Sequence, residues 1–188
     1  MTTKESLKHL IAGNKRFFSG NSTHPLQDRK RIHEIKNEQN PFAIVLSCSD
    51  SRVVPEMAFD TGLGELFVIR VAGNVANTSS IASIEYALIQ FAVPLIVVLG
   101  HQNCGAVIAA LGGGDNGHNL NHLLAHIAPA INKSKSNVVD EVVKTNSILT
   151  ARDLMERSPI ISEAVKQKKV EIRAAFYQLT DGKVIFLD

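Results

Sequence analysis

Residues 42–52 read FAIVLSCSDSR, an apolar run that ends in a thiol, a carboxylate and a guanidinium. The run 42–47 is short, rich in branched side chains and without helical periodicity, which predicts a β-strand buried on both faces. The end of this strand delivers Cys48, Asp50 and Arg52 into one small volume. A strand of this kind is typical of a parallel sheet that is covered by helices on both sides.

A second stretch repeats this pattern of an apolar run followed by polar and thiol side chains. Residues 95–100 read LIVVLG, which predicts another buried strand, and His101 and Cys104 follow it closely. In parallel α/β sheets, sites form outside the carboxyl ends of the strands, so we expect His101 to lie close to Cys48. The only two cysteines of the chain would thus meet at one edge of the sheet.

The rest of the chain alternates between strand and helix patterns, which predicts right-handed crossovers between parallel strands. An Asp181-Gly182 turn predicts a closing hairpin. The expected fold is α/β: a mostly parallel central sheet flanked by helices, with an antiparallel C-terminal edge strand and an N-terminal helical arm. Strands are expected at 42–47, 66–69, 94–100, 170–177 and 183–187, and helices at 53–59, 78–91 (capped by Thr78 or Ser79), 104–111, 120–131, 138–157 and 159–168.

The first 40 residues form a separate kind of segment. An amphipathic helix is expected at 5–18 and a short charged helix at 28–37, with polar sequence between them. This arm has too few apolar residues for a core of its own. We therefore expect one domain over residues 1–188, whose arm 1–40 docks onto the core or onto a partner subunit.

Composition excludes several functional classes. The chain of 188 residues is 45% hydrophobic and 20% charged, with 20 basic against 18 acidic residues, which argues against a nucleic-acid partner. The N-terminal sequence resembles no export signal, and no apolar run approaches the ~20 residues that span a bilayer. We expect a cytoplasmic protein without a membrane partner, whose cysteines are free or metal-bound.

Two thiolates and one imidazole suit Zn²⁺, and three protein ligands with one open position are typical of a catalytic zinc site. Asp50 could bind the metal and close the site. Paired with Arg52, it would instead accept a hydrogen bond from metal-bound water. On spacing alone, buried structural cysteines and a structural Asp50–Arg52 ion pair remain alternatives.

Two other patterns favour simpler interpretations. His118, His122 and His126 recur every four residues, as in a second metal site or a proton relay, but a solvated helix face is favoured. Residues 112–117 match G-x-G-x-x-G, yet they follow a helix and not a strand. They therefore indicate a flexible turn and not a dinucleotide site.

Two motifs stand out together, Cys48-x-Asp50-x-Arg52 and His101-x-x-Cys104-Gly105. They closely resemble the zinc motifs of the β-class carbonic anhydrases, and the resemblance extends through residues 10–17, 59–68, 70–74 and 177–187. It implies a zinc lyase that hydrates CO₂ reversibly to bicarbonate and a proton, by attack of zinc-bound hydroxide. One Zn²⁺ per chain would be held by Cys48, His101 and Cys104, with Asp50 and Arg52 orienting the fourth ligand.

The resemblance also implies an assembly. Members of the family form dimers with the active sites at the interface and an N-terminal arm wrapped around the partner, and further assembly to tetramers is common. This would give a homodimer as the minimal unit, with a homotetramer as a further possibility. Implied substrate-binding residues are Thr61, Gly105, Val71, Ala72 and Gly73.

Two departures from the family pattern have consequences. Thr61 stands where many members carry a Gln whose amide is thought to contact substrate, and its reach is shorter. Val45 stands where members with a regulatory bicarbonate site carry Trp, although Arg70 matches the Arg of that site. We therefore expect no regulatory bicarbonate pocket and an open, water-ligated zinc. Alternatives are a non-catalytic zinc-binding or sensor module with a closed site, or a hydrolase of CS₂ or COS.

Overall fold

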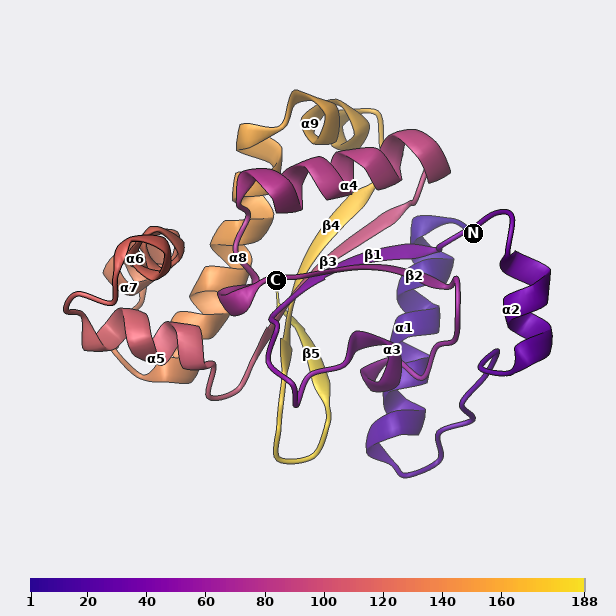
Figure 1. The fold of residues 1–188 in the computed structure, drawn as a ribbon, viewed down its shortest axis with the longest axis horizontal. Helices are drawn as coiled ribbons and strands as arrows, with labels where there is room; N and C mark the ends of the chain where they lie inside the picture. The colour runs from indigo at the N-terminus through magenta and orange to yellow at the C-terminus, as the bar shows by residue number, and fades with distance from the viewer. Residues whose placement is uncertain (188) are drawn as a thin grey trace.

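The computed structural model describes residues 1–187, which fold around a five-stranded sheet of order β2-β1-β3-β4-β5 (Figure 1). β1 runs parallel to both β2 and β3, and β4 runs parallel to β3. β5 pairs with β4 in the antiparallel sense at the far edge. The predicted fold class is therefore confirmed. The strands are β1 (Ala43–Ser47), β2 (Leu66–Arg70), β3 (Leu95–His101), β4 (Glu171–Tyr177) and β5 (Val184–Leu187).

Helices cover both faces of the sheet (Figure 1). α1 and α3 pack on one face, and α4, α8 and α9 pack on the other. None of the helices within residues 1–187 combines the length and the apolar character needed to cross a membrane. The helices are α1 (Thr3–Phe18), α2 (Arg29–Ile35), α3 (Pro55–Ala58), α4 (Thr78–Phe91), α5 (Gly105–Gly112), α6 (His118–Ala125), α7 (Ala128–Lys133), α8 (Val139–Arg157) and α9 (Pro159–Lys166).

β1 and β3 each have a neighbouring strand on both sides, and helices cover both of their faces. Every residue of both strands is buried, as their unbroken apolar sequences predict. In β1, Val45 faces the cluster that contains Leu10 of α1, whereas Ile44 and Leu46 face the cluster built on α4, α8 and α9. Because both faces are buried, a shift in register would place the wrong side chains against each helical layer.

The first helix of the arm is fixed to the core by polar contacts. The side-chain amide of Asn14 donates to the carbonyl oxygens of Ala58 and Gly182 at 2.8 and 2.9 Å, and its oxygen accepts from the N–H of Val184 at 2.8 Å. A Cβ on Gly13 would lie 1.8 Å from the carbonyl oxygen of Phe59, so only glycine allows this approach. α1 therefore docks on its own chain, whereas α2 buries no residue.

Two local predictions were wrong. The segment predicted as one helix at 120–131 is two helices, because α6 ends at Ala125 and Pro129, in the first turn of α7, has no N–H to continue an α-helical ladder. The cap of α4 is Asn77, and not Thr78 or Ser79. Its side-chain oxygen accepts from the N–H of Ser80 at 2.9 Å, the usual N-cap contact.

A buried carboxylate, Asp60, joins the arm to the loop that follows α3. Asp60 is 2% exposed, and its oxygens accept hydrogen bonds from Arg16 Nε and from the backbone N–H groups of Thr23 and His24. Burial raises the pKa of Asp60, but these hydrogen bonds outweigh it and lower the pKa to about 2. Asp60 is therefore ionised when it accepts these hydrogen bonds.

This pKa predicts how acid weakens the fold. Because the folded-state pKa of about 2 lies below the ordinary 3.8, ionised Asp60 should contribute about 2 kcal/mol to the free energy of unfolding. The contribution is fully present above pH ~4 and is lost as the pH falls towards the folded-state pKa. We expect urea unfolding of the wild type and Asp60→Asn to differ most near pH 7, with a gap that shrinks below pH 4. A gap independent of pH would contradict this assignment.

Candidate metal centre

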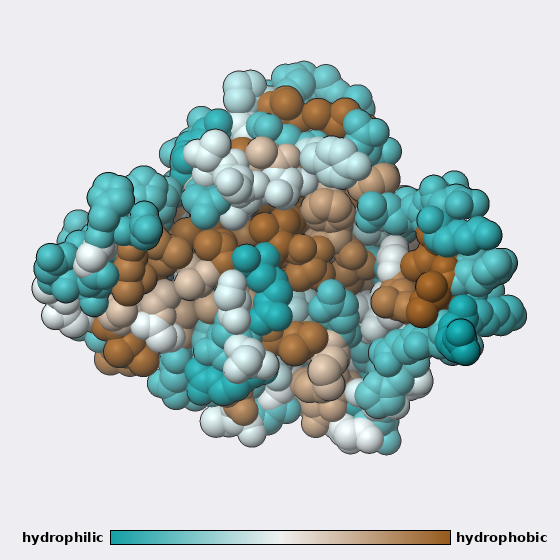
Figure 2. Space-filling model, viewed as in Figure 1, coloured by the Kyte–Doolittle hydropathy of each residue, from teal (hydrophilic) through white to brown (hydrophobic). Residues whose placement is uncertain are grey.

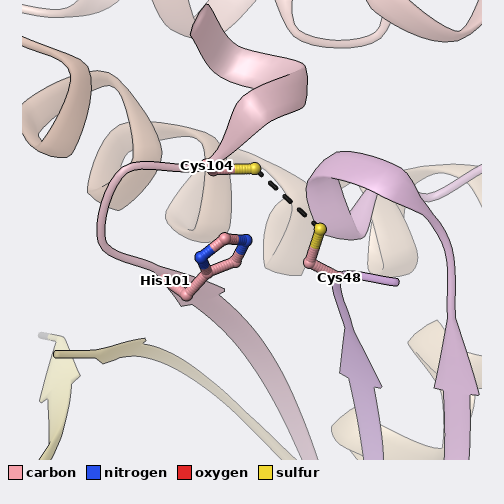
Figure 3. A group of neighbouring side chains, drawn as sticks. All are labelled: Cys48, His101 and Cys104. Carbon is pink, nitrogen blue, oxygen red and sulfur yellow. Dashed lines mark hydrogen bonds between the residues drawn. The ribbon is translucent and has the colours of Figure 1, made fainter. Parts of the chain in front are cut away.

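Three side chains converge at the carboxyl edge of the sheet (Figure 3). Cys48 directly follows β1, His101 is the last residue of β3, and Cys104 is the N-cap of α5. Because β1 and β3 are parallel neighbours, their ends lie side by side, as the sequence predicts. The ligand atoms of the three residues all lie within 4.8 Å of one another, and each residue is at most 4% exposed.

The spacing of the two sulfurs matches a tetrahedral zinc site. Cys48 Sγ and Cys104 Sγ are 3.9 Å apart. Two Zn–S bonds of about 2.3 Å at the tetrahedral angle would place two sulfurs about 3.8 Å apart. The contact between the two sulfurs lowers the pKa of Cys48, whereas the same contact and burial raise the pKa of Cys104. The contact therefore favours a single thiolate in the pair.

His101 offers the third donor in a defined tautomer. Its Nδ1 lies 2.9 Å from the carbonyl oxygen of Gln102, and since a carbonyl only accepts, Nδ1 must carry the proton. The lone pair is therefore on Nε2, which is buried and has no hydrogen-bond partner among residues 1–187. A buried nitrogen without a partner is costly unless something binds it. The donor set S, S, N is one that zinc prefers, so the residues fit this metal.

Asp50 and Arg52 form a bidentate ion pair beside the three donors. Arg52 Nε lies 2.9 Å from Asp50 Oδ1, and Arg52 Nη2 lies 2.8 Å from Oδ2. The hydrogen bonds from Arg52 hold the pKa of Asp50 well below its ordinary value, so the carboxylate stays ionised. Asp50 Oδ2 is also 3.8 Å from His101 Nε2. An ionised acceptor thus faces the unpaired nitrogen.

The turn of residues 71–74 borders the Cys48 sulfur. The N–H of Gly73 donates to Cys48 Sγ at 3.4 Å. Gly73 has a φ of +72°, and a Cβ there would lie 2.9 Å from Ile127 Cδ1, so glycine is needed for both backbone and space. Val71 and Ala72 precede it and are half-buried.

The structure places the remaining predicted substrate residues differently. Gly105 adjoins Cys104 and opens α5, where its Cα faces open space. Thr61 is 1% exposed in the loop after α3, and its hydroxyl donates to the carbonyl oxygen of Glu56 at 3.2 Å. Within the described chain no hydrogen bond joins Thr61 to the three donors. A role for Thr61 towards substrate stays a prediction.

Arg70 supports the site in a way that sequence analysis missed. Its Nε donates to the carbonyl oxygen of Cys48 at 3.0 Å, and its Nη2 donates to that of Asp50 at 2.6 Å. The guanidinium thus fixes the backbone of Cys48 and Asp50, whose side chains belong to the site. The pairing of Ser47 with Arg70 across β1 and β2 places it there, and no sequence spacing signals that register.

The fold and the donor set together define a class: an α/β protein with a candidate Cys₂His zinc centre at the carboxyl edge of its parallel strands. Within residues 1–187, no other group of three or more His, Cys, Asp or Glu residues has ligand spacing. The centre is thus the single candidate metal site of this kind in the part of the chain that the structure describes.

Comparison with known proteins gives the family. The family model described as carbonic anhydrase matches residues 43–184. Carbonic anhydrase 2 of Mycobacterium tuberculosis is 38% identical over 188 residues, covering 96% of this chain and 91% of the relative. The carbonic anhydrase of Mycolicibacterium smegmatis is 39% identical over 184 residues, covering 94% and 89%. The chain therefore belongs to the carbonic anhydrase family.

A solved structure shows which class of that family shares the fold. One of two tetrameric β-carbonic anhydrases from Sordaria macrospora superimposes with a TM-score of 0.77 and covers 96% of each chain. Sequence identity in this comparison is 22%, so the comparison shows the fold alone. The resemblance to the β class that the sequence motifs indicate is confirmed.

We expect the purified protein to retain one Zn²⁺ per chain, measured by elemental analysis. Cys104→Ser should reduce zinc affinity by more than the ~10–100-fold typical of losing a group outside the ligand set, because a ligand itself is removed. Ser49→Ala, which changes an exposed neighbour of Cys48, is the matched control and should keep the metal. Equal zinc content in wild type and Cys104→Ser would show that the metal lies elsewhere.

Proposed function

We propose that this protein is a zinc-dependent carbonic anhydrase that interconverts CO₂ and bicarbonate with release or uptake of a proton. One observation carries the proposal. The buried, unpaired Nε2 of His101 lies within 4.8 Å of both sulfurs and beside an ionised Asp50 that is held by Arg52. Membership of the carbonic anhydrase family and the names of the mycobacterial relatives support it.

Cys48 Sγ, Cys104 Sγ and His101 Nε2 would hold one Zn²⁺. When bound, zinc supplies a Lewis acid that lets water act as a nucleophile near neutral pH. The carbonyl of Gln102 keeps the imidazole in the required tautomer by accepting from Nδ1. Gly73 donates to Cys48 Sγ and so keeps that sulfur in place.

Asp50 would orient the attacking water. An ionised carboxylate can only accept hydrogen bonds, so Asp50 fixes where the water's hydrogen points and leaves an oxygen lone pair for the carbon of CO₂. Arg52 keeps the carboxylate ionised and at a fixed angle through its two contacts. Substrate would lie against the turn 71–73 and Gly105, with Thr61 as a further substrate residue.

The ion pair supports an open coordination position over a closed one. Both oxygens of Asp50 are engaged by Arg52, and Oδ2 stays 3.8 Å from His101 Nε2. We also propose that no regulatory bicarbonate pocket exists. Two observations support this: Arg70 already binds the carbonyls of Cys48 and Asp50, and Val45 is fully buried in the core.

The ion pair gives the test of this function. We expect Asp50→Ala and Arg52→Ala each to lower kcat for CO₂ hydration by about 100-fold or more, because an oriented proton acceptor typically contributes that much. Both variants should keep one Zn²⁺ per chain, since neither residue is a ligand. Stopped-flow assays with zinc content measured on the same samples check this. Full activity in both variants would remove the pair from the mechanism.

We further propose that the protein is a homodimer through the free edge of β2, with tetramers as a higher assembly. Every residue of β2 is at least partly exposed, and an apolar edge strand left open invites pairing. Figure 2 shows apolar side chains gathered across the middle of the molecule in this view, below α4. Tyr86 is 51% exposed within an aromatic cluster with Phe67 and Phe91. The β-carbonic anhydrases of Sordaria macrospora, which share this fold, are described as tetrameric, and this supports assembly.

A charge placed in the aromatic cluster of Phe67, Tyr86 and Phe91 should break the dimer. We expect Tyr86→Lys to convert the dimer into monomers at micromolar concentration, measured by sedimentation velocity, because burying an unpaired ammonium is strongly unfavourable. Ile185→Lys places the same charge on the opposite edge strand, at a residue that is 39% exposed, and should leave the dimer intact. An unchanged dimer in Tyr86→Lys would contradict the β2 interface.

The cytoplasm is the proposed compartment. Both cysteines are free thiols, which suits a reducing environment and a metal site that needs thiolates. We also propose that residues 1–188 form one domain. The packing of Leu10 of α1 into the same cluster as Val45 and Val97 of the sheet supports this.

A further inference from the structure

Helix α8 buries polar side chains where a helix packed on a sheet would normally bury apolar ones. Asn146 is 2% exposed and lies between the apolar positions Val142 and Leu154 on the buried side of the helix. A buried polar side chain needs hydrogen-bond partners, so the partners of Asn146 show what it does.

Asn146 holds the turn that touches the Cys48 sulfur. Its Nδ2 donates to the carbonyl oxygen of Gly73 at 2.9 Å, and the N–H of the same Gly73 donates to Cys48 Sγ at 3.4 Å. Gly73 has a φ of +72°, and glycine populates many other conformations when nothing fixes it. The amide of Asn146 therefore selects the conformation in which this N–H points at the sulfur.

Asp140, in the first turn of α8, holds the segment between the other two donors. Its Oδ1 accepts from the N–H of Asn103 at 2.9 Å. Asn103 lies between His101 and Cys104 and has a φ of +52°, an uncommon conformation for a residue with a side chain. The carbonyl of Asn103 faces Arg52 Nη2 at 3.5 Å, so the same residue also borders the ion pair.

We propose that α8 positions the metal centre. Asn146 fixes the turn beside Cys48, and Asp140 fixes the segment between His101 and Cys104. Neither residue touches the three donors, so both act as positioning residues. The inference rests on the proposed zinc site and adds a role that the site geometry alone does not assign. Partners outside the ligand set typically change metal affinity by about 10–100-fold, which sets the expected effect.

The test measures how fast zinc leaves the loaded protein when a chromogenic chelator is in excess. Asn146→Ala and Asp140→Ala should each release zinc about 10–100-fold faster than wild type. Asp140→Asn keeps an oxygen that can accept from Asn103, so it should release zinc at close to the wild-type rate. Cobalt-substituted samples provide a second readout, because thiolate-to-cobalt absorption should shift in Asn146→Ala.

Leu154→Ala is the control for a general loss of stability. Leu154 is fully buried in α8, and its truncation should lower the thermal unfolding midpoint at least as much as Asn146→Ala does. It should nevertheless leave zinc release unchanged, because it makes none of these contacts. Equally fast release from Leu154→Ala would overturn the inference, since fold stability would then explain the effect.

Other outcomes are equally decisive. If Asn146→Ala does not fold, the comparison of Asp140→Ala with Asp140→Asn decides, because Asp140 is only half-buried in the first turn of α8. Wild-type release from both alanine variants would overturn the positioning role while leaving the zinc site intact. A wild-type protein that holds no zinc would instead overturn the proposed function, and this inference with it.

Discussion

One imidazole nitrogen and two sulfurs are buried together, and no hydrogen-bond donor within residues 1–187 satisfies the nitrogen. Leaving a buried polar atom unpaired costs about 1–3 kcal/mol, so this arrangement persists only if a ligand compensates for it. A cation that accepts one lone pair from each of these three atoms compensates for this cost. The need for such a cation connects the fold to the chemistry, because the central strands β1 and β3 and the segments that follow them bring these donors together.

Other features of the centre follow from holding an anion beside the buried donors. Asp50 sits beside the donors as an anion, and Arg52 balances its charge while leaving one face of the carboxylate towards His101. Arg70 fixes the backbone beneath Cys48 and Asp50, and α8 fixes the turns on either side. A preorganised acceptor beside a Lewis acid needs little rearrangement as the reaction proceeds, which is where such sites gain most of their rate.

The sequence allowed most of the sheet and the three donors to be predicted, and particular residues show why. Unbroken apolar runs such as 42–47 and 95–100 have one stable environment, and both strands end in residues with obvious metal chemistry. The break between α6 and α7 was missed because the apolar periodicity continues across it. Arg70 and Asn146 could not be assigned, because their partners depend on sheet register and helix docking. Asn146 left one signal, a polar residue at a buried helix position.

The most direct test of the central claim is stopped-flow CO₂ hydration by the wild-type protein, metal-free and zinc-loaded, from mildly acidic to mildly alkaline pH. We predict turnover that requires zinc and persists at neutral pH, because Arg52 holds Asp50 away from the metal position as an ionised acceptor. Activity that appears reversibly only at alkaline pH would show that Asp50 binds the metal, against the open site. No activity at any pH, with one zinc per chain, would contradict the proposed enzyme.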